Sequence, residues 1–413
     1  MSETSNKITK LIARAKKGNI TAQLTLAGIY DNGTEVDQDY GLAARWFLKA
    51  AMLGSAEAQA HIGEMYLHGT GVNKNPKKAI YWFQRAADQE NADGLANLGW
   101  CYRNGLSIKQ DFKKAFKYYQ KAARLGHPGA RYNLGFMYAN GCGARQDDLE
   151  ALNWYLQAAK QGNRKAQLNI GLIYAQGIGT KKNYIEAVEW FRKAAEQGYG
   201  KAQYNLALMY ARGHGVPRDY REAAKWHQEA AELGYYRAQY YLGLLYLHAR
   251  GVKQDYSEAL DWLLKSSEQG YHKAQYEVGK IYANGLGVPV DTQEATMWFR
   301  HAAAQGHVKA QFRLGNHFAK GLGVEQSDVV AFRWYLKAAK HGYAPAQYYL
   351  GVMYSKGRGI TQDYAKAYSW LYVAAAAHEP HSMLALKKVA KKLNKLELAE
   401  ATRAGERLCS KYG

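Results

Sequence analysis

NRKAQLNIGLIYAQGIGTKKNYIEAVEWFRKAAEQG, residues 163–198, contains two apolar stripes separated by a turn. The stripes have helical spacing, and their members are Ala166, Ile170, Ile173 and Tyr174, followed by Ala187, Trp190, Phe191, Ala194 and Ala195. Gly177 and Gly179 interrupt the chain between the stripes, and Gly198 follows the second, as glycine does where a left-handed turn is needed. The stretch therefore predicts two amphipathic α-helices that lie antiparallel because the turn between them is short.

The same pattern recurs at a constant interval of 36 residues along the chain. Nine of the ten tryptophans share one phase of it, and Tyr118 takes the vacant place: Trp46, Trp82, Trp154, Trp190, Trp226, Trp262, Trp298, Trp334 and Trp370. An alanine stands three residues before each of these aromatic positions: Ala43, Ala79, Ala115, Ala151, Ala187, Ala223, Ala259, Ala295, Ala331 and Ala367. The sequence thus contains ten copies of one helix pair.

Neither helix of a copy can bury its apolar stripe alone, so neighbouring copies must stack. A further column of small residues, in the first helix of most copies, permits close helix approach: Gly63, Gly99, Gly135, Gly171, Gly243, Gly279, Gly315 and Gly351. The sequence therefore predicts an all-α solenoid of antiparallel helix pairs.

The repeated residues resemble the Sel1-like repeat family, a branch of the tetratricopeptide-like helical repeats. The resemblance rests on the pattern A-Q-x-x-L-G-x-x-Y-x-x-G-x-G-V-x-x-D-Y-x-x-A-x-x-W-x-x-K-A-A-x-x-G, which covers nearly the whole chain. It implies a right-handed α-solenoid superhelix with ten repeats over residues 19–378. Residues 1–18 are expected to form an N-terminal capping helix, and residues 379–413 a basic helical cap at the C-terminus.

Two copies depart from the pattern and are expected to be local weak points. In the third copy Tyr118 replaces tryptophan, Gly94 and Leu95 replace Ala-Gln, and Glu90 and Ser107 replace glycines. In the seventh copy Ala249 replaces the first loop glycine, and Ser266 and Ser267 replace the paired alanines.

The charge balance predicts attraction to anionic partners. The chain has 56 Lys and Arg against 35 Asp and Glu, a formal net charge of +21, without a run of like charges typical of a nucleic-acid-binding tail. It lacks an apolar signal core and any long apolar stretch, so we expect a cytoplasmic protein without a membrane span, or one exported by a non-Sec route. Three scattered cysteines, Cys101, Cys142 and Cys409, suit a reducing compartment.

The first helix of each copy has a variable face opposite its apolar stripe, and the family resemblance implies that this face is concave and binds the partner. One column of the face is aromatic: Tyr132, Tyr204, Tyr240, Tyr276, Phe312 and Tyr348. The adjacent column holds Asn133, Asn169, Asn205, Tyr241, Glu277, Arg313 and Tyr349. Tyrosine and asparagine suit peptide or protein recognition. The alternative is that the aromatic rings only brace neighbouring first helices.

A third column is basic and lies near the start of successive first helices: Lys165, Lys201, Arg237, Lys273 and Lys309. Further cations expected on the same side are Arg212, Lys280, Lys320 and Lys356. Cations at a helix N-terminus oppose the helix dipole, which indicates an acidic partner. The alternative is an ordinary solvated face, since exposed charges are common and screened by salt.

No motif for catalysis, a cofactor or a metal is present. The repeated G-x-G, as at Gly213 to Gly215, follows no strand and marks a turn rather than a phosphate loop. His378 and His381 flank Glu379 and Pro380, where proline prevents a regular ligand-bearing helix. Some relatives resembling this family were named as β-lactamases, but those carry paired cysteines that this chain lacks. We therefore expect neither an enzyme nor a cofactor.

The function expected from these residues is that of a non-enzymatic adaptor, which binds a peptide or protein on the concave face of the solenoid. One alternative is a binder of nucleic acid or another anionic polymer through the basic surface. Another is a secreted bacterial factor that uses the same scaffold to interact with a host. The sequence leaves the oligomeric state and the partner's identity open.

Overall fold

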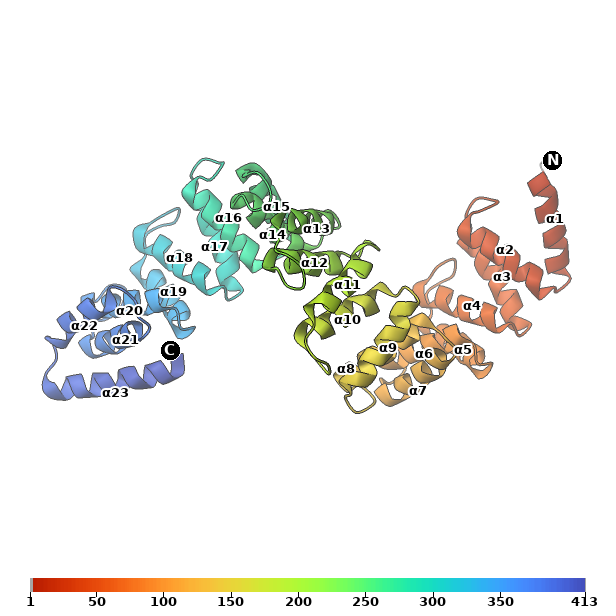
Figure 1. The fold of residues 1–413 in the computed structure, drawn as a ribbon, viewed down its shortest axis with the longest axis horizontal. Helices are drawn as coiled ribbons and strands as arrows, with labels where there is room; N and C mark the ends of the chain where they lie inside the picture. The colour runs from red at the N-terminus through yellow and green to blue at the C-terminus, as the bar shows by residue number, and fades with distance from the viewer. Residues whose placement is uncertain (1–2, 413) are drawn as a thin grey trace. The chain divides into compact units, whose positions relative to one another are not determined.

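The structure, a computed structural model, describes residues 3–412, and within them the chain forms 23 α-helices and no β-strand (Figure 1). Consecutive helices pack as antiparallel pairs, so the predicted all-α solenoid is confirmed. Residues 1, 2 and 413 of the two expected caps lie outside the described residues.

First and second helices alternate along the chain, with even and odd labels respectively. The first helices are α2 (Ile20–Asn32), α4 (Ala56–His68), α6 (Ala92–Asn104), α8 (Pro128–Asn140), α10 (Arg164–Gln176), α12 (Gly200–Arg212), α14 (Tyr236–Leu247), α16 (His272–Asn284), α18 (Val308–Lys320) and α20 (Ala344–Lys356). The second helices are α3 (Tyr40–Met52), α5 (Pro76–Asp88), α7 (Phe112–Arg124), α9 (Asp148–Lys160), α11 (Tyr184–Ala195), α13 (Tyr220–Glu232), α15 (Tyr256–Glu268), α17 (Thr292–Ala304), α19 (Asp328–Lys340) and α21 (Tyr364–Ala376). The flanking helices are α1 (Glu3–Lys16), α22 (Ser382–Ala390) and α23 (Lys395–Tyr412).

The copy at residues 163–198 shows how the sequence sets the helix ends. The side chain of Asn163 accepts a hydrogen bond from the backbone N–H of Ala166 at 3.0 Å and so caps the start of α10. Gly177, with φ of 74°, ends α10 in the left-handed region. The backbone N–H of Asn183 then donates to the carbonyl of Tyr174 at 2.9 Å, which closes the turn. The two helices are thereby fixed side by side.

A glycine in the first helix and a large side chain in the second form the centre of most copies. A Cβ atom on Gly171 would lie only 2.5 Å from the ring of Phe191, so the ring occupies the space that glycine leaves. The equivalent pairs are Gly63–Phe83, Gly99–Tyr119, Gly135–Tyr155, Gly243–Leu263, Gly279–Phe299, Gly315–Tyr335 and Gly351–Leu371. In the sixth copy Ala207 replaces glycine, and the fully buried His227 stands where the others have their large side chain.

The tryptophan column is less uniformly buried than the alanine column. Trp46, Trp82, Trp262 and Trp370 are 7–8% exposed, whereas the other five in-phase tryptophans are half-buried. At the half-buried Trp190 the ammonium group of Lys193 lies 4.3 Å from the ring centroid. The half-buried Trp190 ring thus combines partial burial with a cation–π contact at the surface.

A buried glutamine joins neighbouring copies and explains the A-Q motif. In the second copy the side-chain amide of Gln59 donates to the carbonyl of Ala51 at 3.1 Å, and its Oε1 accepts from Gln89 Nε2 at 2.8 Å. The same amide pair recurs as Gln167–Gln197, Gln239–Gln269 and Gln275–Gln305. The third copy has Leu95 instead and keeps its position buried without the amide. These bonds connect three helices of adjacent copies in each case.

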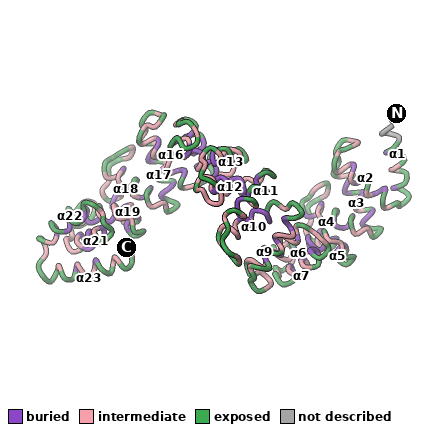
Figure 2. Tube along the Cα trace, in the orientation of Figure 1, coloured by how far each residue is buried: buried purple, intermediate pink, exposed green. Residues whose placement is uncertain are grey.

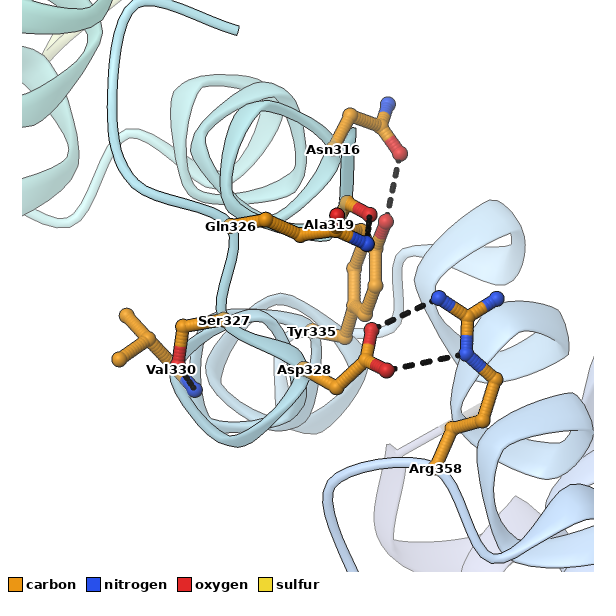
Figure 3. Close-up of polar contacts among 8 residues, drawn as sticks. All are labelled: Asn316, Ala319, Gln326, Ser327, Asp328, Val330, Tyr335 and Arg358. Carbon is orange, nitrogen blue, oxygen red and sulfur yellow. Dashed lines mark hydrogen bonds and ion pairs between the residues drawn. The ribbon is translucent and has the colours of Figure 1, made fainter. Parts of the chain in front are cut away.

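An ion pair in the C-terminal part of the chain also joins two residues 30 positions apart (Figure 3). Arg358, in the turn after α20, donates from Nε and Nη2 to the two carboxylate oxygens of Asp328 at 3.1 and 2.8 Å. Close to it, the hydroxyl of Tyr335 donates to Oδ1 of Asn316 at 2.7 Å. Bidentate guanidinium–carboxylate pairs are stronger than ion pairs with a single hydrogen bond. This pair therefore holds the turn after α20 against the start of α19.

Four residues other than glycine adopt a positive φ among the described residues. Glu90, Ser107 and Ala249 have φ of 55°, 53° and 54°, and each replaces a glycine of the repeat, as His378 with φ of 57° also does. The left-handed conformation costs an ordinary L-residue about 1–2 kcal/mol. The replacements identified in the third and seventh copies therefore carry backbone strain.

The chain divides into two compact units, Met1–Gln197 and Gly198–Gly413. In both, buried residues are spread along the described helices rather than gathered in one centre (Figure 2). Unit 1 begins with α1, in which Ala15 is buried and accepts a hydrogen bond from Gln23. Unit 2 ends with α23, which packs on α21 and accepts a hydrogen bond from Ser369 Oγ at the carbonyl of Ala401. No helix of the described residues is long and apolar enough to cross a membrane.

Candidate partner-binding site

We define the first-helix face as the side of the even-numbered helices, α2 to α20, that carries the variable columns. In unit 2 the aromatic column of this face forms contacts between neighbouring copies. Tyr204, Tyr240, Tyr276 and Phe312 each meet an aromatic residue at the start of the following first helix. The pairs and their ring-centroid distances are Tyr204–Tyr235 at 5.3 Å, Tyr240–Tyr271 at 5.2 Å, Tyr276–His307 at 4.6 Å and Phe312–Tyr343 at 5.2 Å. The bracing contact considered as an alternative is therefore present in the structure.

Burial of these rings limits what they can offer a ligand. Tyr204 is 8% exposed, while Tyr132, Tyr240, Tyr276, Phe312 and Tyr348 are half-buried. Burial raises the pKa of the Tyr204 and Tyr240 hydroxyls, so both stay neutral throughout the physiological range. The half-buried rings of Tyr240, Tyr276 and Phe312 therefore remain partly exposed while they pack on rings of the following copy.

The neighbouring column is more varied in its contacts. Tyr241 stacks on the buried His227 at 5.5 Å, and Glu277 pairs with Lys280 at 2.6 Å. Asn133 accepts a hydrogen bond from Arg103 at 3.0 Å, and Asn205 donates to the Lys201 carbonyl at 2.7 Å. Asn169 is half-buried, whereas Arg313 and Tyr349 are exposed, the latter to 40%. The exposed members of this column are thus at the C-terminal end of unit 2.

The basic column is exposed and electrostatically uncompensated. Lys165, Lys201, Arg237, Lys273 and Lys309 are all exposed. No ion pair among the described residues includes Lys201, Lys273 or Lys309, and the first turns of α12, α14, α16 and α18 contain no acidic residue. Arg212, Lys320 and Lys356 are exposed as well, whereas Lys280 is half-buried and paired with Glu277.

The cations at the starts of α16 and α18 lie close enough together to lower the pKa of a neighbouring histidine. Burial, together with the charges of His272, Lys309 and Lys273, lowers the pKa of His307 to about 4. The starts of α16 and α18 therefore form one region of positive potential. Such a region attracts carboxylates and repels basic segments.

The aromatic residues that directly precede each first helix of unit 2 were not among the candidates from the sequence. Tyr235, Tyr271 and Tyr343 occupy the N-cap position and make no side-chain cap hydrogen bond, unlike Asn163 in unit 1. Replacing a good N-cap residue costs about 0.5–2 kcal/mol. The signal was available, because comparing the N-cap position between copies shows asparagine or serine giving way to tyrosine.

Unit 1 contains a hollow of about 730 Å³ on the first-helix face. It extends over three successive first helices and is lined by Trp100, Arg103, Gly129, Tyr132, Asn133, Gly162, Asn163, Arg164, Lys165 and Gln197. Tyr132, Asn133 and Lys165 were candidates from the sequence, and the structure brings them together. Trp100 and Arg103 were not, although Trp100 stood out as the one tryptophan outside the repeat phase.

The buried histidines and cysteines belong to the packing of the helices. Nδ1 of His317 lies 2.6 Å from Oγ1 of Thr296 and 3.1 Å from the Leu322 carbonyl, in the interior of its copy. Burial raises the pKa of the Cys101 thiol to about 11, which keeps it protonated. No group of three or more histidine, cysteine or acidic side chains in residues 3–412 could hold a metal ion.

Comparisons with known proteins agree with this geometry. The family model described as the Sel1 repeat matches residues 20–55, 56–91, 92–127, 128–163, 164–199, 200–235, 237–271, 272–307, 308–343 and 344–378. The chain is 34% identical to c5321, a protective antigen of uropathogenic Escherichia coli strains with an SLR fold, over 97% of this chain and 86% of that chain, with a TM-score of 0.82. It is also 34% identical to a Sel1 repeat protein from Oxalobacter formigenes, over 75% of this chain and 90% of that chain, with a TM-score of 0.60. No curated protein matches the chain in sequence.

Proposed function

The chain belongs to the Sel1 repeat family, and we propose that it is a non-enzymatic adaptor that binds an acidic segment of a partner protein on its first-helix face. Sel1 repeats are generally scaffolds for protein–protein interaction, which gives the class of function. The first-helix face is the proposed location because its columns vary between copies, whereas the helix contacts behind it are repeated.

The observation that carries the proposal is the exposed basic column of unit 2, whose three lysines form no ion pair among the described residues. Lys201, Lys273 and Lys309 stand at the start of helices whose first turns have no acidic residue. Each cation there is unfavourable by about 0.3–1 kcal/mol through the helix dipole. A bound carboxylate removes this cost and gains charge-assisted hydrogen bonds. An acidic partner therefore accounts for the column better than solvent does.

The test compares two variants with equal changes of charge. The face variant carries Lys201→Ala, Lys273→Ala and Lys309→Ala. The control carries Arg221→Ala, Arg300→Ala and Arg333→Ala, at exposed positions of the second helices α13, α17 and α19. Tyr240 and Tyr276 are left intact because their rings pack between copies.

Tagged wild type and both variants are used for affinity capture from the source cells, followed by mass spectrometry, after circular dichroism has established that all three melt alike. We expect a partner that is recovered with wild type and control and lost with the face variant. Equal recovery with all three proteins would remove the first-helix face of unit 2 as the binding surface.

A further inference from the structure

Trp100 is the tryptophan that does not belong to the repeat. It lies on the first helix α6 and is 39% exposed, whereas the in-phase tryptophans lie on second helices and are buried or half-buried. Other copies place a variety of residues at this position: Glu64, Phe136, Leu172, Leu208, Leu244, Lys280, Asn316 and Val352. The repeat therefore does not require tryptophan there. A partly exposed tryptophan beside a hollow is a typical anchor for a partner's apolar side chain.

Three cations line the hollow next to Trp100, and no acidic side chain does. Arg103 lies on α6 one turn after Trp100, and Arg164 and Lys165 lie at the start of α10, two copies further on. Lys165 takes part in no ion pair among the described residues. The equivalent positions of Lys165 in the second and third copies are Glu57 and Asp93, so Lys165 is the first cation of this column along the chain and the repeat itself does not require one there.

The arginines are held in place before any ligand arrives. Nη1 of Arg103 donates to Oδ1 of Asn133 at 3.0 Å, and its guanidinium lies 4.7 Å from the ring centroid of Phe136. Nη1 of Arg164 donates to the Gln197 carbonyl at 3.4 Å. A guanidinium has five N–H donors, so further donors of Arg103 remain for a carboxylate. Fixing these side chains in advance lowers the entropy lost on binding.

We propose that this hollow, which we term the Trp100 groove, binds an acidic peptide segment. In the bound state an apolar side chain of the segment packs on Trp100, and carboxylates on either side pair with Arg103 and with Lys165. The inference rests on the proposed function, since it gives the scaffold a defined subsite in unit 1 and a chemistry for its partner. A volume of about 730 Å³ is within the range of pockets that hold several side chains.

Other occupants fit the Trp100 groove less well. Single-stranded nucleic acid is usually held by a series of exposed aromatic rings that stack on successive bases, whereas this groove has one exposed tryptophan. A second copy of the chain would bring a formal charge of +21 to a basic surface. Charge complementarity therefore selects the acidic peptide.

The experiment measures fluorescence anisotropy of a fluorescein-labelled octapeptide with six glutamates around a central Leu-Phe pair. A peptide with lysine in place of glutamate and a labelled eight-nucleotide DNA strand are the comparison probes. The groove variants are Trp100→Leu and Lys165→Glu, both of which install residues that other copies carry at the same positions. The matched controls lie on second helices of unit 1: Tyr81→Leu, since Tyr81 is 52% exposed on α5, and Lys117→Glu, which makes the same charge change at an exposed position of α7.

We expect the acidic peptide to bind wild type and to lose about tenfold or more in affinity with either groove variant, because central anchors dominate binding energy. Both controls should stay within about twofold of wild type, as expected for residues outside the contact. The lysine peptide should not bind. Peptide addition should also change the tryptophan emission of wild type, and this change should be missing in Trp100→Leu.

Equal losses with Lys165→Glu and Lys117→Glu would mean that net charge alone attracts the peptide, and would overturn the inference. So would unchanged binding by Trp100→Leu, or tighter binding of the DNA strand than of the peptide. These outcomes are separable from the proposed function. If the unit 2 face variant loses its cellular partner while both groove variants bind the octapeptide as wild type does, the adaptor function stands and the Trp100 groove is not its subsite.

Discussion

Nε2 of Gln269 donates a hydrogen bond to Oε1 of Gln239 at 2.8 Å, across a separation of 30 residues. The amide of Gln239 in turn donates to the carbonyl of Ala231 at 3.2 Å, and Gln239 is 5% exposed. The Gln239 side chain thus donates to a carbonyl near the end of α13 in the preceding copy. It also accepts a hydrogen bond from the Gln269 amide in its own copy. Because the bonds are buried, their loss leaves polar groups without partners.

Changing Gln239→Leu should lower the free energy of unfolding by about 1–3 kcal/mol, the cost of leaving buried polar partners unsatisfied. The double change Gln239→Leu with Gln269→Leu should cost less than the single change, because the third copy carries Leu95 and Leu125 at these two positions. Urea denaturation followed by circular dichroism measures both. A double variant less stable than the single would contradict this account of the glutamine pair.

The strained turn of the seventh copy predicts a stabilising substitution. Ala249 has φ of 54°, so Ala249→Gly should raise the free energy of unfolding by about 1 kcal/mol, because glycine adopts this conformation without strain. The reciprocal change Gly285→Ala, at the equivalent position of the eighth copy with φ of 65°, should lower it by about 1–2 kcal/mol. Thermal melts of the two variants should shift in opposite directions, and a shift of the same sign for both would refute the assignment.

The pairing of Ala207 with His227 predicts energetic coupling between them. Three other copies place glycine opposite phenylalanine, as at Gly171 and Phe191, where a Cβ would come within 2.5 Å of the ring. His227→Phe alone should therefore overpack the sixth copy and cost about 1–3 kcal/mol. Adding Ala207→Gly should recover part of that loss. A double-mutant cycle in urea measures the coupling, and simple additivity of the two changes would argue against the contact.

Buried histidines predict acid sensitivity. Burial lowers the pKa of His227 to about 3, below about 6.5 in the unfolded chain, so the unfolded state binds the proton first. Its contribution to stability is complete above pH about 6.5 and is lost as the pH falls toward about 3. The variant Ala207→Gly/His227→Phe should have a shallower decline of unfolding free energy between these limits. The exposed His301→Gln serves as control, and equal slopes for wild type and the double variant would be inconsistent with a neutral buried His227.

The third copy should exchange its backbone amide protons faster than its neighbours. Glu90 and Ser107 both have positive φ, and Leu95 lacks the amide bonds that glutamine makes elsewhere. Opening of this copy therefore requires less free energy. Hydrogen exchange read by mass spectrometry should show lower protection across residues 90–125 than across residues 162–197. Uniform protection over both stretches would show that the strain is compensated.

The repeat made the architecture predictable from sequence alone. A constant spacing fixes which residues share a helix stripe, and two helices with short turns have few ways to pack. The glycine column could be assigned to close helix approach, but its partner could not. Gly171 meets Phe191, 20 residues later, only because the turn between α10 and α11 brings that ring to the glycine, and turn geometry is not contained in periodicity.

The candidate site was less predictable, because spacing cannot tell an exposed ring from a packed one. Tyr240 and Tyr348 belong to one sequence column, yet burial raises the pKa of Tyr240 more than that of Tyr348. The difference comes from residues at the start of the next helix, such as Tyr271, which contacts the Tyr240 ring. Trp100 was visible in the sequence as an exception, and only the structure showed that it lies at an open hollow.

The constant spacing of the glutamine pairs has a consequence for how the number of repeats can change during evolution. In every copy that has one, donor and acceptor are separated by the same 30 residues, as in Gln59–Gln89 and Gln275–Gln305. Recombination between repeats within the gene can add or remove one complete repeat. Each glutamine donor then still lies at its proper distance from an acceptor. The length of the first-helix face can therefore be adjusted by unequal crossing-over, without compensating substitutions in the interior.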